Sequence, residues 1–426
     1  MPASSKILII TYYWPPCGGA GVQRWLKFSK YLPENGWEPV ILTVDPEYAS
    51  FPAFDTSLLN EIAHGTRVEK TRAVNYFAIN QGAKNKNQSV SGGFATGKTG
   101  GLPGIIARFV RGNFFIPDPR RGWNRYAIKK AIALISDLNI EYVITTSPPH
   151  STQLIGLKLK KRFPSIKWIA DFRDPWTDIY YYRMFLHSFL AKAIDARYEK
   201  IVLKKADLIL TVGESLAKLF ESKVGNIGEK VRVVYNGYDE SDFEEIKSER
   251  SDGQFIITYV GTISDLYPIE GFLHAVNSLI KSSGTFIKVR FVGNISGRHL
   301  AKAIEALGKD HFEHVPYVEH TDSIQYMVNS NLLLLVIPDH PQNELIVTGK
   351  LFEYLRSGSP VMCLCSPGNE ASGIIEQVGA GQSFNYNDTE GMMVYLNQVI
   401  NHGSSYEVPS RFSRKEITKQ LLNNFA

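Results

Sequence analysis

Short apolar stretches of strand length alternate with longer amphipathic stretches along most of the chain. Five lie in the first half (KILII, EPVILTV, EYVITTS, KWIADF and ADLILTV), and five follow in the second (QFIITYVGT, IKVRFVG, EHVPYV, NLLLLVIP and PVMCLC). Strands that are buried on both faces and separated by helices predict parallel sheets covered by helices. Because the series starts twice within 426 residues, we expect an α/β protein with two such domains.

The stretch between the two series predicts the domain boundary. It reads NGYDESDFEEIKSERSDGQ, an Asn-Gly turn followed by charged and polar residues, which is typical of a linker. We expect a first domain over 1–238, a linker over 239–253, a second domain over 254–408 and a C-terminal helix over 409–426. Ligands of open parallel sheets bind beyond the carboxyl ends of the strands, so two facing sheets would leave a cleft.

A glycine-rich turn follows the first expected strand. Gly18, Gly19 and Gly21 have no side chains, so another molecule can approach the backbone closely. The amphipathic stretch from Val22 predicts a helix whose N-terminus attracts an anion. Ala20 breaks a G-x-G-x-x-G fingerprint, and no Gly-Lys-Ser/Thr follows. The turn is therefore interpreted either as a phosphate- or sugar-binding turn or as a plain tight turn.

A second candidate site lies in ELIVTGKLFEYLRSGSPV. The order of residues predicts a helix that starts after a loop and ends at Gly358. Glu353 follows one turn into this helix, and its carboxylate suits the paired hydroxyls of a ribose. Taken alone, it would be interpreted as a solvated helix carboxylate, but its neighbours favour the ribose. The residues expected to present N–H groups or positive charge to a phosphate are Thr348, Gly349, Lys350 and Leu351.

Polar residues also end two strands of the first domain. His150 follows EYVITTS, and Asp171, Arg173 and Asp174 belong to ADFRDPWTD. One of the carboxylates, or His150, is expected to orient an acceptor hydroxyl or the donor sugar. The alternatives are a structural Asp–Arg pair, since buried charges are costly unless paired, and a structural histidine.

Charge is divided unevenly along the chain. Up to Glu240 there are 33 Lys and Arg against 21 Asp and Glu, and after it 14 against 21, so the halves carry net charges of +12 and −7. The basic half would be attracted to an anionic lipid surface, a pyrophosphate-linked substrate or nucleic acid. No dedicated nucleic-acid motif supports the last of these.

Further features bear on location and metal binding. Three cysteines form neither a disulfide framework nor a zinc pattern. No apolar run approaches the roughly 18 residues of a membrane span, and the N-terminus does not resemble a signal peptide. No Asp-x-Asp occurs. We expect a cytoplasmic protein without a metal ion.

One segment of the first half departs from the alternation. NQGAKNKNQSVSGGFATGKTGGLPG predicts a mobile loop, and IIARFVRGNFFIPDPRRGW then interleaves aromatic and basic residues. This second stretch predicts either an amphipathic element on a membrane or a helix packed on the sheet. The arginines expected to contact anionic lipid are Arg108, Arg111, Arg120, Arg121 and Arg125, which flank Phe109, Phe114, Phe115 and Trp123.

The ordered set PPCGGAGVQR, SPPHSTQLIGLKLKK, ADFRDPWTD, NGYD, YVGT and TGKLFEYLRSGSPV resembles a bacterial branch of family 4 glycosyltransferases. The resemblance covers nearly the whole chain. It implies a GT-B fold of two facing Rossmann-like domains, with the donor nucleotide mainly in the C-terminal domain and the acceptor mainly against the N-terminal one. It also implies a final helix that crosses back to the first domain, retaining transfer from a nucleotide sugar, and no cofactor.

The resemblance also assigns residues. Glu353 matches the second glutamate of an E-x7-E motif, while Leu345 stands where the first is expected. Thr262, after Gly261, stands where many members have an arginine. The pyrophosphate is therefore expected to meet Lys350 and Arg298, with Gly18 and Gly19 closing from the other domain.

The expected function is transfer of a sugar from a nucleotide sugar to a glycan or lipid-linked acceptor in surface polysaccharide assembly. The protein would be cytoplasmic or peripheral on the inner face of the membrane, and would not bind nucleic acid. The alternative is a non-catalytic nucleotide-binding subunit of a membrane glycan-assembly complex. A nucleotide-dependent oxidoreductase would need the missing fingerprint.

Overall fold

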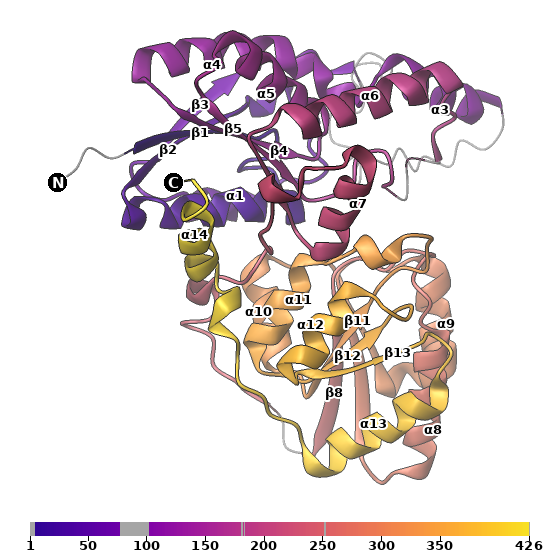
Figure 1. Cartoon of the computed structure of the whole chain (residues 1–426). Coiled ribbons are helices and arrows are strands. Elements are labelled where there is room, and N and C mark those ends of the chain that lie inside the picture. Colours follow the sequence, from indigo (N-terminus) through magenta and orange to yellow (C-terminus); the bar gives the residue numbers. More distant parts are fainter. Residues whose placement is uncertain (1–4, 77–101, 180–181, 183, 251–252, 426) are drawn as a thin grey trace. The chain divides into compact units, whose positions relative to one another are not determined.

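The computed structural model describes residues 5–76, 102–179, 182, 184–250 and 253–425. The chain divides into two compact units, Met1–Tyr235 together with Thr418–Ala426, and Asn236–Ile417. Each unit contains one parallel sheet covered by helices (Figure 1). The predicted α/β class with two Rossmann-like domains is confirmed. The expected linker, 239–253, falls within the second unit, and most of the glycine-rich loop expected over 80–104 lies outside the described residues.

The first sheet has seven strands in the order β3-β2-β1-β4-β5-β6-β7. Its central strands are runs of buried apolar residues, as in KILII of β1, where Ile7 to Ile10 are fully buried. The strands are β1 (Ser5–Ile10), β2 (Trp37–Val44), β3 (Arg67–Thr71), β4 (Tyr142–Ser147), β5 (Lys167–Phe172), β6 (Leu208–Thr211) and β7 (Val231–Val233).

Helices cover both faces of this sheet, with α1 on one face and α4 and α5 on the other (Figure 1). The helix predicted after the glycine turn is confirmed, since Val22, Trp25 and Leu26 of α1 are buried. The helices of the unit are α1 (Ala20–Tyr31), α3 (Leu102–Phe114), α4 (Asn124–Leu138), α5 (Ser151–Arg162), α6 (Phe189–Lys205) and α7 (Glu214–Val224).

The second sheet has six strands in the order β10-β9-β8-β11-β12-β13. Its strands are β8 (Gln254–Val260), β9 (Phe286–Val292), β10 (Phe312–Val315), β11 (Leu332–Val336), β12 (Val361–Leu364) and β13 (Gly381–Phe384). Its helices are α8 (Glu270–Ser282), α9 (Gly297–His311), α10 (His320–Val328), α11 (Gly349–Ser357), α12 (Glu370–Val378) and α13 (Thr389–His402). Helix α11 ends at Gly358 in the left-handed conformation (φ 75°), as the sequence predicts.

The predicted return of the chain's end to the first unit is confirmed. Helix α14 (Arg414–Leu422) starts in the second unit, and the residues from Thr418 onward belong to the first. Tyr142 donates a hydrogen bond from its hydroxyl to the Phe425 carbonyl (3.0 Å), and Trp37 packs edge-on against the Phe425 ring.

The strand order places the loops that concern function. In each sheet the order reverses beside the first strand of the unit, between β1 and β4 and between β8 and β11. Ligands of open α/β sheets bind at such switch points, beyond the carboxyl ends of the strands. The loops that begin there contain the glycine turn after β1, His150 after β4 and Gly261 after β8.

Three further observations concern disulfide bonds, metal ligands and membrane-spanning helices. Cys17, Cys363 and Cys365 are free and buried. Within the described ranges, no cluster of His, Cys, Asp and Glu has the make-up of a metal site. No helix in those ranges combines the length and apolar character that crossing a membrane requires.

Candidate functional site

In the second unit, the end of β8 and the start of α11 form a small basic site. The Lys350 ammonium donates a hydrogen bond to the Tyr259 hydroxyl (2.9 Å) and lies 4.3 Å from the centre of its ring. Gly261 has φ +127°, and a Cβ atom at this position would lie 2.5 Å from Lys350 Nζ. The positive φ favours glycine at this position, and a larger residue would also have to displace the lysine ammonium.

Lys350 is a buried cation with a neutral partner. Burial lowers the pKa of Lys350 from 10.5 to about 8, against the nearby Glu353 carboxylate, which raises it. Among the described residues its ammonium donates one hydrogen bond, to a phenol, so two of its three N–H groups have no acceptor there. A desolvated ammonium of this kind is stabilised by a charge-assisted hydrogen bond to a phosphate oxygen.

The first turn of α11 adds further hydrogen-bonding capacity. Thr348 precedes the helix, and its buried hydroxyl has no hydrogen-bond partner among the described residues. Gly349 follows, and a Cβ atom there would lie 4.0 Å from the Asn236 amide. Leu351 differs from the expectation, because its N–H donates to the Thr348 carbonyl (3.2 Å) and its side chain is fully buried.

Glu353 lies one turn further, where the motif predicts it. Its carboxylate accepts a hydrogen bond from His320 Nε2 (3.1 Å), and His320 Nδ1 lies 4.0 Å from Asp242. Glu353 is thus held by a neighbouring helix rather than being a solvated helix carboxylate.

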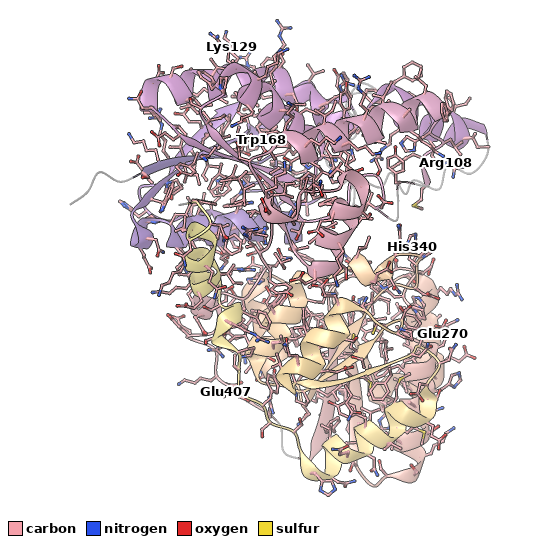
Figure 2. All side chains as sticks on the ribbon, viewed as in Figure 1. Arg108, Lys129, Trp168, Glu270, His340 and Glu407 are labelled. Atoms are coloured by element: carbon pink, nitrogen blue, oxygen red, sulfur yellow. The ribbon has the colours of Figure 1, made fainter. Side chains whose placement is uncertain are left out.

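Two other residues expected near the nucleotide-sugar donor have other contacts in the structure. Arg298, in the first turn of α9, has an exposed side chain 3.8 Å from Glu270, which also pairs with Lys302 (Figure 2 labels Glu270). The Thr262 side chain is exposed, and its carbonyl accepts a hydrogen bond from the Tyr259 hydroxyl (2.9 Å). The ion cluster on α8 and α9 therefore holds Arg298, while Thr262 orients the tyrosine beneath Lys350.

In the first unit, the glycine turn is fixed by the backbone. Gly18 donates to the Ala53 carbonyl (2.9 Å), and Gly19, with φ +89°, precedes α1. No side chain caps this helix, and its first turn carries no carboxylate. Arg173 donates from Nη1 to the Gly21 carbonyl (2.7 Å) and from Nη2 to the Pro148 carbonyl (3.3 Å). Arg173 thus joins the turn to the loop after β4.

Asp171 is fully buried, and both of its oxygens accept hydrogen bonds. Arg24 pairs with it at 2.9 Å, and Trp25 and Thr146 donate at 2.8 and 2.7 Å. Arg24 is itself buried and donates to the Val234 carbonyl (2.8 Å). The expected structural Asp–Arg pair exists, but its arginine is Arg24 rather than Arg173. The geometry gives Asp171 a positioning role for α1 and leaves it no surface for a substrate.

His150 and Asp174 flank this pair. The His150 ring stacks on Trp176 (5.2 Å between centres), and neither ring nitrogen has a hydrogen-bond partner within the described residues. Burial, with the positive Lys223 and Arg173, lowers the pKa of His150 to about 3. Burial also raises the pKa of Asp174, against the effect of Arg173. Unlike Asp171, Asp174 has no hydrogen bond to another residue in the described ranges.

Sequence reasoning missed several residues that hold these sites. Tyr259 and His320 hold Lys350 and Glu353, and Arg24 holds Asp171. Asp118 accepts hydrogen bonds from the Ser151 N–H (2.7 Å) and hydroxyl (2.9 Å), which fixes the start of α5 beside His150. The tyrosine and Arg24 stand inside quoted motifs, whereas no local pattern indicates His320 or Asp118.

Solved structures share this fold over nearly their whole length. The Anabaena protein Alr3699/HepE, solved in complex with UDP, is similar with a TM-score of 0.63 and 13% identity over 99% of each chain. Sucrose-phosphate synthase from Thermosynechococcus elongatus has a TM-score of 0.61 and 13% identity, covering 99% of this chain and 98% of that one. A UDP-N-acetylglucosamine 2-epimerase has a TM-score of 0.56 and 11% identity, covering 99% and 97%. No curated protein sequence matches the chain.

The two parallel sheets, the returning C-terminal helix and these structural neighbours define a protein of the GT-B class. Residues 93–242 match the model of Glycosyltransferase Family 4. The chain is therefore similar to this family over those residues, which lie mainly in the first unit.

Proposed function

We propose that the protein transfers a sugar, with retention, from a nucleotide sugar bound to the second unit to a glycan or lipid-linked acceptor. The observation that carries the proposal is the buried Lys350 ammonium beside Gly261 at the switch point of the second sheet. The remaining N–H groups of Lys350 and the Thr348 hydroxyl, which have no partners among the described residues, suit a diphosphate. A uridine nucleotide is the first candidate, because the similar Anabaena protein was solved with UDP.

Within this proposal, Glu353 accepts hydrogen bonds from the ribose hydroxyls while His320 holds its carboxylate. Lys350 stabilises the charge that develops on the departing diphosphate. The bond between the sugar C1 and the diphosphate oxygen breaks, and a bond from C1 to the acceptor oxygen forms on the same face. The acceptor proton passes to the departing diphosphate oxygen.

In the first unit, Asp174 is proposed to orient the acceptor hydroxyl, since its carboxyl makes no hydrogen bond to another described residue. His150 would act as a neutral group, since its pKa is about 3. Arg173 and Asp171 are positioning residues, because their bonds fix the glycine turn and α1.

A thermal-shift screen of UDP-, GDP- and ADP-sugars tests donor binding. A ligand at about 100 times its Kd adds roughly 2.7 kcal/mol to stability. Lys350→Met should reduce this stabilisation to less than about 1 kcal/mol, and Lys281→Met, which removes an exposed lysine of α8, should keep it. Acceptor-dependent release of the nucleoside diphosphate then tests transfer.

The outcomes separate the alternatives. If the protein binds a donor but releases no nucleoside diphosphate with any acceptor supplied, a non-catalytic subunit is favoured. Thr262 and Leu345, which replace the expected Arg and Glu, would agree with that result. Absence of any shift with all three donor classes would refute the proposal.

A further inference from the structure

Exposed apolar side chains gather on α3 and at the start of α6, and the segment just before α6 is hydrogen-bonded to the end of α3. Four of these side chains are Ile106 (54% exposed), Phe109 (46%), Phe189 (89%) and Leu190 (68%). Single exposed apolar residues are ordinary, but a contiguous group marks an interaction surface. The remaining members of what we call the apolar patch are Ile105 and Leu186.

Hydrogen bonds hold the two halves of the apolar patch together. Asn113 of α3 donates to the Leu186 carbonyl (2.8 Å) and accepts from the Ser188 N–H (2.8 Å). The Arg111 guanidinium lies 4.2 Å from the centre of the Phe185 ring. These contacts therefore hold α3 and the segment before α6 in place relative to each other.

The chain around the apolar patch is free of carboxylates. The sequence contains no Asp or Glu between Glu69 and Asp118, and none between Asp178 and Asp195. Arg108 stands on the exposed side of α3 (Figure 2), and Lys192 follows Leu190 on α6.

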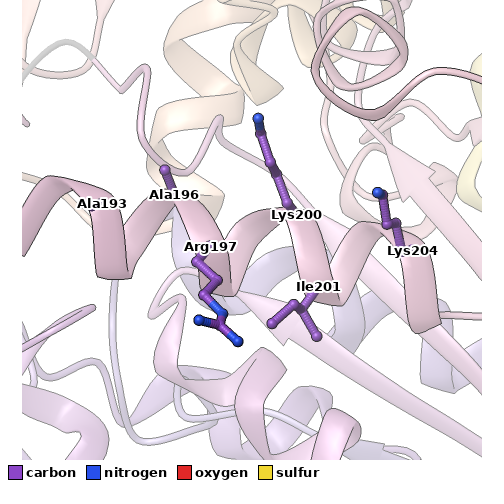
Figure 3. A pocket seen from close by; sticks show the side chains of 6 residues that line it. All are labelled: Ala193, Ala196, Arg197, Lys200, Ile201 and Lys204. Carbon is purple, nitrogen blue, oxygen red and sulfur yellow. The ribbon is translucent and has the colours of Figure 1, made fainter.

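The outer face of α6 continues this cationic surface. Arg197, Lys200 and Lys204 are exposed and line a shallow hollow of about 330 Å³ with Ala193, Ala196 and Ile201 (Figure 3). Both carboxylates of the helix point inward. Asp195 accepts from Trp176 Nε1 (2.8 Å), and Glu199 pairs with Lys223 (2.7 Å). We call Arg197, Lys200 and Lys204 the basic face.

We propose that the apolar patch and the basic face together dock the first unit on an anionic lipid membrane. The apolar side chains would enter the interfacial region, and the cations would lie at the headgroup phosphates. A second copy fits less well, because two such basic faces would repel each other. The inference rests on the proposed function in that it gives the transferase a membrane-borne acceptor.

The docking surface differs from the one expected from the sequence. Arg120 is buried, donates to the Ser50 carbonyl (3.0 Å) and lies over the rings of Tyr12 and Tyr13. Trp123 is also buried and donates to Thr71 (2.8 Å). These two residues belong to the core, whereas Arg108 and Phe109 remain at the surface.

Sedimentation with vesicles tests the docking without any sugar donor. The wild-type chain should bind phosphatidylglycerol-containing vesicles at low salt, and bind much less at about 0.5 M salt or to phosphatidylcholine alone. Combined Arg197→Gln, Lys200→Gln and Lys204→Gln should weaken binding about 100-fold, at roughly fivefold per residue. Combined Ile106→Ser, Phe109→Ser, Phe189→Ser and Leu190→Ser should also weaken it.

Control variants remove the same number of positive charges, or one exposed apolar side chain, elsewhere on the protein. Lys129→Gln, Lys167→Gln and Lys218→Gln together, and Val394→Ser, should bind vesicles as the wild type does. No binding at low salt, or equal losses in the controls, would overturn the docking. So would self-association that only the patch variants abolish, since that result assigns the surface to a second copy.

Donor binding separates this proposal from the proposed function. Patch and basic-face variants should keep the wild-type thermal shift with the nucleotide sugar. If the wild type shows the thermal shift but does not bind vesicles, only the docking is refuted. If the wild type binds vesicles but shows no thermal shift with a nucleotide sugar, only the donor site is refuted.

Discussion

The buried lysine of the second unit makes donor binding depend on pH. In the free protein the pKa of Lys350 is lowered to about 8 from 10.5. A bound diphosphate would restore the charged form and raise this pKa towards its ordinary value. Below pH 8 the lysine is already protonated, so affinity is constant there. Above pH 8 binding must take up a proton, so affinity falls as pH rises.

The magnitude follows from this shift. At pH 7 about nine tenths of Lys350 is protonated, and at pH 9 only about one tenth is. If the pKa in the complex is near 10.5, the UDP-sugar affinity falls about tenfold between pH 7 and pH 9. Removing one partner of a buried, hydrogen-bonded charge pair costs about 2–5 kcal/mol. Lys350→Met should therefore bind at least about 30-fold more weakly at pH 7.

Isothermal titration calorimetry at pH 7, 8 and 9 measures both effects. The wild type should show the tenfold decline, and Lys350→Met should not. Ionisation of the uracil base of the ligand affects binding to both proteins equally, so it cancels in the ratio of their affinities. Lys281→Met should follow the wild type. Lys350 would be excluded from the donor site if the wild-type affinity did not change between pH 7 and pH 9 and Lys350→Met bound the donor as tightly as the wild type.

Three further substitutions test the remaining assignments. Glu353→Gln should weaken nucleotide binding in calorimetry with an unchanged fold, and unaltered affinity would leave Glu353 only as the partner of His320. Asp171→Asn leaves Arg24 buried without its counter-ion, so urea unfolding should show a loss of about 3–5 kcal/mol; a loss below about 1 kcal/mol would contradict that role. Asp174→Asn should lower turnover more than donor affinity in steady-state kinetics, whereas equal losses would indicate a structural role.

Local patterns in the sequence predict most of the central elements. Apolar runs predict the buried strands, and the spacing of Val22, Trp25 and Leu26 predicts the inner face of α1. The edge strands β3, β7 and β13 were not predicted. Strand β3 reads RVEKT and β13 reads GQSF, and both are partly exposed. An edge strand does not need the continuous apolar pattern of a buried one. The stretch EHVPYV was expected as a strand throughout, but β10 ends at Val315.

Sequence motifs also located the residues around the donor site, since Thr348, Lys350 and Glu353 lie within one helical turn and a half. Periodicity places such neighbours on a helix without knowledge of the rest of the fold. The lowered pKa of Lys350 was not predicted, because it comes from burial in the folded unit, where Lys350 also donates a hydrogen bond to Tyr259. The two residues stand 91 positions apart.

Only the tertiary structure decided which charged residues are buried and with what partner. Asp171 pairs with Arg24, 147 positions away, and not with Arg173 beside it. Arg120 and Arg108 belong to one basic stretch of sequence, yet Arg120 is buried in the core and Arg108 is exposed. Sequence spacing determines which side chains share a face of a helix or strand. Whether that face meets solvent or a distant segment is set by the packing of the whole domain, because a buried charge is stable only where packing also brings its partner.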